Sequence, residues 1–190
     1  MKIYTRKGDD GTTGLLYGGR VPKDSALISA NGAVDEAQAA LGVVRAASEP
    51  GSELDQRLIA LERDLYVLMA ELATAAPNRH KLQPGTSLVT AEMVASLEAD
   101  IDSVTGRFPP LTDFVIPGHD AVSAALDVAR TVVRRAERKA LAAAPEGSLV
   151  VPYLNRLSDL LWTLARCQEH GESLLSKRVP QSGRSNNASR

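Results

Sequence analysis

Residues 54 to 72, "LDQRLIALERDLYVLMAEL", carry a regular pattern of leucines that points to a helix. The leucines follow one another at alternating intervals of four and three residues, and they are Leu54, Leu58, Leu61, Leu65, Leu68 and Leu72. Because an α-helix completes a turn in about 3.6 residues, this spacing places all of them on one stripe. Such a stripe is typical of the seam between packed helices, so we predict a helix that belongs to a bundle.

Four other segments repeat the helical spacing of apolar residues. The first follows a cap at Asp24 or Ser25 and carries Ala30, Val34, Ala37, Leu41 and Val44. Another carries Val94, Leu97, Ile101 and Val104. A further helix should run from near Pro117 to about Ala144, with an inward row of Val122, Ala125, Ala129, Val132 and Ala136. The last carries Leu154, Leu157, Leu161, Leu164 and Cys167. No stretch after Tyr17 alternates as a strand does, so the sequence predicts an all-α fold, a five-helix antiparallel bundle.

Length and composition favour a single domain. A chain of 190 residues with 44% hydrophobic content can bury one sizeable core. We assign residues 1–176 to one helical domain that includes an amino-terminal loop at about 4–24. Residues 177–190 are rich in Ser, Asn, Gly and Arg, which is the composition of a polar tail.

Charge and cysteine content exclude several classes of partner. The net charge of −1 gives no cationic excess for nucleic acid or for an anionic membrane surface. No run reaches the roughly 18 apolar residues of a membrane span, and the amino terminus lacks the apolar core of a signal peptide, so we expect a cytoplasmic protein. The single cysteine, Cys167, excludes an internal disulfide, and its apolar surroundings predict a buried, inert thiol.

The amino-terminal stretch TRKGDDGTTG, residues 5–14, has the residue types that bind polyphosphate. Glycines allow backbone N–H groups to approach phosphate oxygens, and threonine hydroxyls and basic side chains add donors and charge. The spacing matches neither a Walker loop nor the dinucleotide-binding glycine pattern. Taken alone, the stretch is also consistent with a flexible, turn-rich amino terminus.

Arginines gather on the fourth predicted helix. Arg130, Arg134 and Arg138 are four residues apart and so share one face, and Glu137 lies one turn from Arg134. Such a ridge can clamp a triphosphate through bidentate contacts, although a solvated helix face with an ion pair explains the same residues.

Two polar clusters accompany apolar stripes. Asn155, Ser158, Asp159 and Trp162 lie at helical spacing on the last helix, either as a binding surface or as an interhelical polar network. In the stretch NGAVDE, residues 31–36, Gly32 and the later Gly42 permit close approach of a helix or ligand, and Asp35 is either an arginine partner or a surface carboxylate. The three histidines make no metal-binding spacing, so we expect no protein-ligated transition metal.

Read together, these features resemble the PduO-type ATP:cob(I)alamin adenosyltransferases, a family of corrinoid adenosyltransferases. The matching stretches run in the family's order from Tyr4 to Arg166 and are YTRKGDDGTTGLLYGGRVPKDS, NGAVDEAQAALG, FVIPG, ARTVVRRAERKA and YLNRLSDLLWTLAR. The co-occurrence of RRAER, LNRLSD and the amino-terminal loop makes the resemblance specific.

The resemblance implies a ferritin-like helical bundle that assembles as a homotrimer, with active sites between subunits. It implies that ATP, with Mg²⁺, contacts the amino-terminal loop and the fourth and fifth helices through Thr5, Arg6, Lys7, Gly8, Thr13, Gly14, Lys23, Arg134, Arg135, Ala136, Glu137, Arg138 and Asn155. It also implies a salt bridge between Asp35 and Arg134 across the subunit interface. Phe114 is expected at the cobalt face, where an apolar ring displaces the lower axial ligand and makes cob(II)alamin easier to reduce.

The implied reaction transfers the 5′-deoxyadenosyl group of ATP to cob(I)alamin, forming adenosylcobalamin and releasing triphosphate. Further partners are a mutase that uses adenosylcobalamin and a corrinoid reductase, since no flavin or iron–sulfur motif is visible. Two positions depart from the family pattern, His119 after Gly118 and Gly14 in place of a hydroxyl residue. The alternatives are an ATP-binding bundle that delivers or senses without turnover, and a purely structural oligomerisation bundle.

Overall fold

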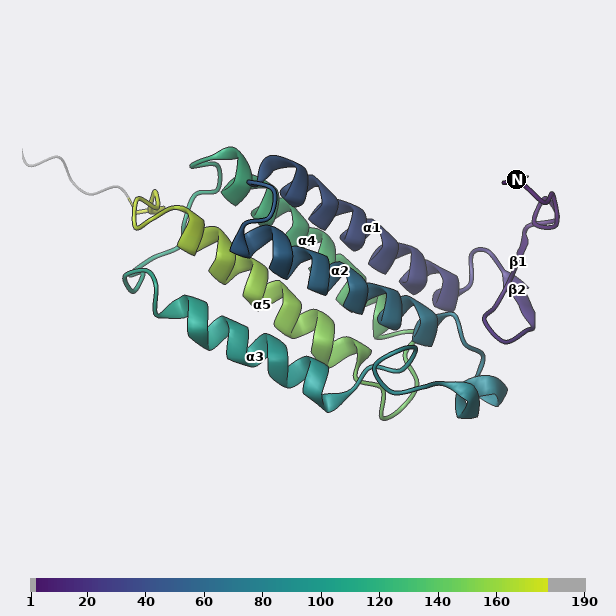
Figure 1. Cartoon of the computed structure of the whole chain (residues 1–190). Helices are drawn as coiled ribbons and strands as arrows, with labels where there is room; N and C mark the ends of the chain where they lie inside the picture. Colours follow the sequence, from purple (N-terminus) through teal and green to yellow (C-terminus); the bar gives the residue numbers. More distant parts are fainter. Residues whose placement is uncertain (1–2, 178–190) are drawn as a thin grey trace, which may run out of the picture.

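The computed structural model describes residues 3–177, and helices dominate it (Figure 1). The α-helices are α1 (Ala26–Ala47), α2 (Glu53–Leu72), α3 (Ala91–Thr105), α4 (Ala121–Ala140) and α5 (Val150–Gln168). A 3-10 helix, η1 (Ala76–Lys81), and two short strands complete the elements. The helical fold predicted from the sequence is confirmed. Of the predicted tail, only Lys177 lies within the described residues.

The leucine stripe forms the buried face of α2, as predicted. Leu58, Leu65 and Leu68 are fully buried, and the other leucines of the stripe are buried or packed against the core. Ser52 caps the helix by accepting a hydrogen bond from the backbone N–H of Asp55 at 3.2 Å. The spacing therefore identified both the helix and the face that it buries.

The helices lie side by side in a bundle whose centre is α1, α4 and α5 (Figure 1). Helix α4 packs against both α1 and α5, α2 packs on α1, and α3 packs on α5. Small residues of α1 and α4, among them Ala30, Ala37, Ala129 and Ala136, are fully buried. Their short side chains allow the helices of the pair to approach closely.

Helix α4 begins later and ends earlier than the sequence suggested. Pro117 was expected at its start, but Asp120 caps it and accepts hydrogen bonds from the backbone N–H groups of Val122 (2.8 Å) and Ser123 (2.9 Å). The fully buried row is Leu126, Ala129, Val133, Ala136 and Ala140, whereas the predicted Val122, Ala125 and Val132 are only partly buried. The register of the buried face is thus shifted by one residue at two of the predicted positions.

A small β-hairpin that the sequence did not predict precedes α1. Strand β1 (Thr12–Gly14) pairs antiparallel with β2 (Arg20–Pro22), and the hairpin projects beyond the end of the helices (Figure 1). The backbone N–H of Leu16 donates to the carbonyl of Ala73 at 2.8 Å. This bond fastens the hairpin to the carboxyl end of α2.

A buried carboxylate organises the same end of the bundle. Glu71 is fully buried and accepts from Arg79 Nη2 (2.9 Å), Ser148 Oγ (2.7 Å) and the backbone N–H of Val89 (2.9 Å). Several partners satisfy its charge, so its burial is tolerated. Glu71 thereby joins α2, the long connection after it and the α4–α5 connection near the hairpin.

Cys167 was predicted to be a buried thiol. Cys167 is half-buried rather than buried, because it lies near the end of α5 and borders a cavity. Within residues 3–177, none of the helices combines the length and the apolar character that crossing a bilayer requires.

Candidate functional site

The amino-terminal loop is organised by its own side chains. Arg20 donates from Nε (3.0 Å) and Nη2 (2.6 Å) to Thr12 Oγ1, and also from Nη2 to the carbonyl of Lys7. Asp10 accepts from the backbone N–H of Thr12 at 2.9 Å and from its hydroxyl at 2.8 Å, and these bonds lower the pKa of Asp10. The loop is therefore a folded structure with Arg20 at its centre, a role that the sequence did not reveal.

Gly8 and Lys23 lie against one another in this loop. A Cβ added at Gly8 would lie 3.1 Å from both Cε and Nζ of Lys23 and 3.1 Å from the carbonyl oxygen of Thr12. The backbone N–H of Lys23 donates to the carbonyl of Gly11 at 2.9 Å, which fixes where its side chain begins. A glycine at position 8 therefore leaves the space in which the Lys23 ammonium lies over the loop.

This contact leads to a prediction for Gly8→Ala. The added methyl group displaces the Lys23 ammonium, so the affinity for ATP should fall about tenfold, the worth of one charge-assisted hydrogen bond. Titration of the purified protein with ATP in a calorimeter measures the change. Gly106→Ala is the matched control, because Gly106 follows α3, outside the loop, and a Cβ there meets no atom within 4 Å. Equal affinities for the two variants would contradict the role of this contact.

The other loop residues predicted to contact ATP lie in or just before the β1–β2 hairpin and are at least partly exposed to solvent. Thr5, Arg6 and Lys7 are exposed, and Thr13 is half-buried in the β1–β2 ladder. Gly14 is exposed and lies outside the left-handed backbone region, so a hydroxyl residue would fit there. Glycine in place of the family's hydroxyl residue therefore removes a side chain at position 14 without requiring a different backbone conformation. The proposed contacts of these residues with ATP stay predictions.

The arginine ridge of α4 divides into paired and exposed members. Arg130 Nε pairs with Asp127 Oδ1 at 3.2 Å, and Arg135 pairs with Glu36 of α1. Arg134 and Arg138 are exposed, and neither forms an ion pair with a described residue. The ridge thus presents two solvent-facing cations one turn apart. Ala136, between them in sequence, faces the core and is fully buried.

The fourth and fifth helices meet at the polar residues predicted to bind nucleotide. Asn155 Nδ2 donates to Glu137 Oε1 at 3.0 Å, and Arg156 Nη1 donates to Asn155 Oδ1. The hydrogen bond between Asn155 and Glu137 joins the LNRLSD stretch of α5 to the RRAER stretch of α4. Of the remaining cluster, Ser158 is buried and donates to the Asn155 carbonyl at 2.8 Å, while Asp159 is exposed.

Asp35 lies on the outer surface of α1. It is exposed, and no ion pair joins it to Arg134 or to another residue of the described chain. Gly32 is likewise exposed, and a Cβ there would meet no atom within 4 Å. At Gly42 the nearest atom is Glu62 Oε1 at 3.8 Å, an ordinary contact. Packing within the chain therefore requires neither glycine.

Phe114 lies in the connection between α3 and α4, and 84% of its surface is exposed. Phe114 is therefore not part of the hydrophobic core. It borders a cavity of about 600 Å³ whose other lining residues are Leu111, Thr112, Asp113, Val115, Pro117, Asp127, Arg130, Trp162 and Arg166. The first arginine of the ridge and the aromatic residue thus border the same cavity.

A buried charge network forms the wall of this cavity. Arg166 is 1% exposed, and its Nη2 lies 2.6 Å from Asp127 Oδ2 and 2.9 Å from Glu169 Oε1. The guanidinium carbon also lies 5.9 Å from the centre of the Trp162 ring, and Phe108 packs edge-on against that ring. This network is not evident from the sequence, because Arg166 has the pattern of an ordinary basic residue near the end of a helix.

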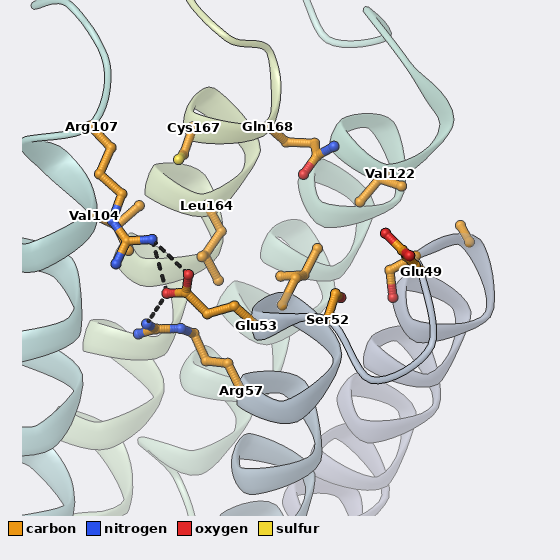
Figure 2. Close-up of a pocket in the computed structure, with 13 residues that line it drawn as sticks. Glu49, Ser52, Glu53, Arg57, Val104, Arg107, Val122, Leu164, Cys167 and Gln168 are labelled. Atoms are coloured by element: carbon orange, nitrogen blue, oxygen red, sulfur yellow. Dashed lines mark hydrogen bonds and ion pairs between the residues drawn. The ribbon is translucent and has the colours of Figure 1, made fainter.

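A second cavity, of about 320 Å³, lies between the ends of the helices (Figure 2). Glu53 lies between Arg57 and Arg107, at 3.1 Å and 2.9 Å from them, and so compensates both charges. None of the residues predicted to bind ATP or corrinoid lines it. Phe114 and Arg130 line the other cavity instead.

His119, the other departure from the family pattern, is exposed at the start of α4. Its Nε2 lies 3.8 Å from Glu172 Oε2. Gly118 takes the left-handed backbone conformation with φ of 110°, whereas His119 does not take it. A side chain at position 119 is therefore compatible with the turn.

The chain matches known proteins over most of its length. The family model described as "Cobalamin adenosyltransferase" matches residues 3–168. A corrinoid adenosyltransferase of Mycobacterium tuberculosis is 44% identical over 170 residues, which are 87% of each chain. One from Bacillus subtilis is 37% identical over 173 residues, covering 87% of this chain and 86% of that one.

The fold is also similar to solved structures of a PduO-type ATP:corrinoid adenosyltransferase from Lactobacillus reuteri. A phenylalanine-to-alanine variant of that enzyme, complexed with cobalamin and ATP, has a TM-score of 0.82 and 28% sequence identity. The match covers 93% of this chain and 100% of that chain. From the extent of these matches, together with the loop, the arginine ridge and the exposed phenylalanine, the chain belongs to the cobalamin adenosyltransferase family.

Proposed function

We propose that this protein transfers the 5′-deoxyadenosyl group of ATP to the cobalt of cob(I)alamin, releasing triphosphate. The observation that carries the proposal is the course of the arginine ridge. Arg130 borders the Phe114 cavity, and Arg138 lies two turns further along α4, about 12 Å away along the helix axis. This length suits an extended nucleoside triphosphate.

The charge distribution orients the nucleotide along the ridge. Arg134 and Arg138 are the exposed cations, and the hairpin with Lys7 and Lys23 lies at the same end of the bundle. The triphosphate binds there, and the ribose points toward the Phe114 cavity. Asn155, positioned by Glu137, supplies a neutral hydrogen-bonding group beside the nucleotide.

The chemistry then requires positioning rather than a protein nucleophile. The electron pair of cob(I)alamin attacks C5′ of ATP, the cobalt–carbon bond forms, and the bond from C5′ to the triphosphate oxygen breaks. Triphosphate leaves with that bonding pair, and its growing negative charge is stabilised by the basic residues. Phe114 occupies the lower axial side of the corrin, which favours reduction of the cobalt beforehand. The electrons for this reduction come from a separate reductase.

Mg²⁺ accompanies the ATP in this proposal. Within residues 3–177, no three His, Cys, Asp or Glu side chains gather as a metal site. Mg²⁺ commonly keeps several water ligands and binds through substrate phosphates with one or two carboxylates. These residues therefore suit a metal ion that is held mainly by the triphosphate. Asp9 and Asp10 are the carboxylates that directly follow the predicted ATP contacts Lys7 and Gly8 in the sequence.

We also propose that the chain assembles as a homotrimer with the sites at its interfaces. Helices α1 and α4 expose apolar side chains, with Val43 61% and Val128 60% exposed. The same helices carry the exposed Gly32, Asp35 and Arg134. Burial of this surface against a second chain would cover the valines and bring Asp35 to an arginine.

The proposed Asp35–Arg134 salt bridge between subunits gives a prediction. Asp35→Asn leaves Arg134 unpaired and partly desolvated, so assembly or transition-state binding should weaken by about 2–5 kcal/mol. Light scattering measures the mass of the assembly, and steady-state kinetics measure the loss of activity. Asp102→Asn, which removes an exposed carboxylate of α3 by the same substitution, is the control. Full activity and an intact trimer in Asp35→Asn would refute the pair.

One spectroscopic experiment tests the function itself. The protein is incubated with ATP, Mg²⁺ and chemically reduced cobalamin, and the absorption spectrum is followed for the cobalt–carbon product. We expect product and triphosphate in equal amounts. Binding of ATP without product would indicate a protein that senses the nucleotide or delivers adenosylcobalamin.

A further inference from the structure

The segment that carries Phe114 pairs with the chain beyond α5. Val115 and Leu175 form an antiparallel bridge. The backbone N–H of Ile116 donates to the Leu174 carbonyl at 2.7 Å, and that of Ser176 donates to the Phe114 carbonyl at 2.8 Å. This register places Ile116 opposite Leu174 and Phe114 opposite Ser176.

The register also decides which side chains share a face. Because side chains alternate along an extended chain, Phe114, Ile116 and Leu174 lie on one face of the pair, and Val115 and Leu175 lie on the other. The first three are exposed, Ile116 by 46% and Leu174 by 61%, whereas Val115 and Leu175 are half-buried. The pair therefore presents an apolar surface to solvent beside the Phe114 cavity.

Polar contacts fasten the two segments together. Asp113 Oδ1 accepts from the backbone N–H of Phe114 at 2.8 Å and from Ser176 Oγ at 3.2 Å, and Asp113 Oδ2 pairs with Lys177 Nζ at 3.1 Å. The Phe114 N–H, followed by the Lys177 ammonium, lowers the pKa of Asp113. Asp113 therefore stays ionised and links both segments.

The start of the second segment is fastened to the core. Glu169, fully buried, pairs with Arg166 and accepts a hydrogen bond from Ser173 Oγ. Ser173 immediately precedes Leu174, so the buried network fixes where Leu174 begins its pairing. Leu174 is thus held beside Ile116 from both ends of the short segment.

We propose that Leu174 is a specificity-determining residue of the corrinoid site, which acts together with Phe114 and Ile116. The three side chains form an apolar platform against the lower face of the corrin ring. This inference rests on the proposed function, because it assumes that Phe114 lies below the cobalt. The Phe114 ring covers the lower axial position of the cobalt. Ile116 and Leu174 flank the ring, and they prevent water and the displaced base from reaching the cobalt past the edge of the ring.

The size and exposure of the platform support this role. Exposed large apolar side chains adjacent to one another are uncommon on a surface that has no ligand, and these come from segments about 60 residues apart in the chain. Their joint presentation depends on a ladder and an ion pair rather than on core packing. Such an arrangement positions the side chains outward against a ligand.

The test is the ratio of adenosylation rates on cobalamin and on cobinamide, both supplied as the cobalt(II) form together with a separate reductase, measured for Leu174→Asn. Cobinamide lacks the nucleotide base that acts as lower ligand, so the platform has nothing to exclude from it except water. With cobalamin the rate should fall about tenfold, because the base is no longer kept away from the cobalt and the form that is harder to reduce persists; a tenfold change corresponds to about 1.4 kcal/mol. With cobinamide the rate should change by less than about twofold. Leu174→Met should restore the cobalamin rate.

Leu141→Asn is the matched control, because Leu141 is a leucine of similar exposure (66%) just beyond α4. It should leave the rate ratio as in the wild type. Electron paramagnetic resonance of the cobalt(II) corrinoid with ATP gives a second measurement. The nitrogen splitting of the lower ligand should be lost in the wild-type complex and retained in part with Leu174→Asn.

The outcomes separate this inference from the proposed function. If Phe114→Ala changes the rate ratio and Leu174→Asn does not, the platform is refuted and the enzyme activity stands. If the wild-type protein adenosylates neither corrinoid, the proposed function fails and this inference fails with it. A lower melting temperature with equal losses on both corrinoids would make Leu174 a structural residue only.

Discussion

Phe114→Ala is expected to slow adenosylation of cobalamin by about 10- to 100-fold, while the affinity for ATP and the melting temperature stay close to those of the wild type. The lost contact between ring and corrin is worth about 1.5–3 kcal/mol, which gives this range of rates. Because Phe114 is 84% exposed, its removal creates no cavity in the chain, and the stability should change by no more than about 0.5 kcal/mol. Single-turnover kinetics that start from cob(II)alamin, with the electron supplied by a separate reductase, measure the rate, because the lower ligand is displaced before the cobalt is reduced.

The control for this experiment is the rate of adenosylation of cobinamide, compared with the rate for cobalamin. Cobinamide has no base to displace, so Phe114→Ala should impair its reaction less. Phe108→Ala tests the other phenylalanine, which packs against Trp162 and should affect stability more than the rate ratio. Equal rate losses on cobalamin and cobinamide, with a large fall in melting temperature, would return Phe114 to a structural role.

Arg166→Met is expected to destabilise the fold by about 3–5 kcal/mol, the loss typical when one partner of a buried ion pair is removed. Asp127 and Glu169, 4% and 0% exposed, would then share a buried region without the guanidinium that lies within 3 Å of both. For a chain of this length the melting temperature should fall by about 6–20 °C. Differential scanning calorimetry measures it.

Arg107→Met is the matched control for this variant. Arg107 pairs with Glu53 at 2.9 Å, but their side chains are 44% and 62% exposed, so water solvates both charges (Figure 2). Its loss should cost at most about 1 kcal/mol. Similar melting temperatures for the two variants would show that the buried network does not stabilise the fold.

Helical spacing made most of the fold predictable, and local capping chemistry explains where it did not. The leucines of α2 mark a buried stripe because their periodicity extends over several turns. At α4 the proline signal pointed to Pro117, but the Asp120–Ser123 capping box satisfies the first backbone N–H groups and sets the start. The hairpin of β1 and β2 was missed because three-residue strands are too short to show alternation.

Candidate site residues could be named from the sequence where they lie close together in it. In the loop and in the RRAER stretch, the basic and polar residues lie within a few positions of one another. Asn155 donates a hydrogen bond to Glu137 because α4 and α5 are adjacent helices. The Arg166 network and the pairing of Phe114 with Ser176 join residues far apart in the chain. Tertiary contacts of this kind leave no local pattern in the sequence, so they could not be predicted from it.

The arrangement of the helices has a consequence for the order in which the chain folds. Helices α1 and α2 are joined by a short turn, as are α4 and α5 by a somewhat longer one, so each pair forms a local hairpin. The contact of α1 with α4 closes a loop that contains α2 and α3 and therefore carries the larger entropic cost. Docking of the two hairpins through the small residues of α1 and α4 is then the step that sets the folding rate. Substitutions at Ala37 and Ala129 would slow folding itself, whereas changes on α3, which packs at the edge on α5, would mainly accelerate unfolding.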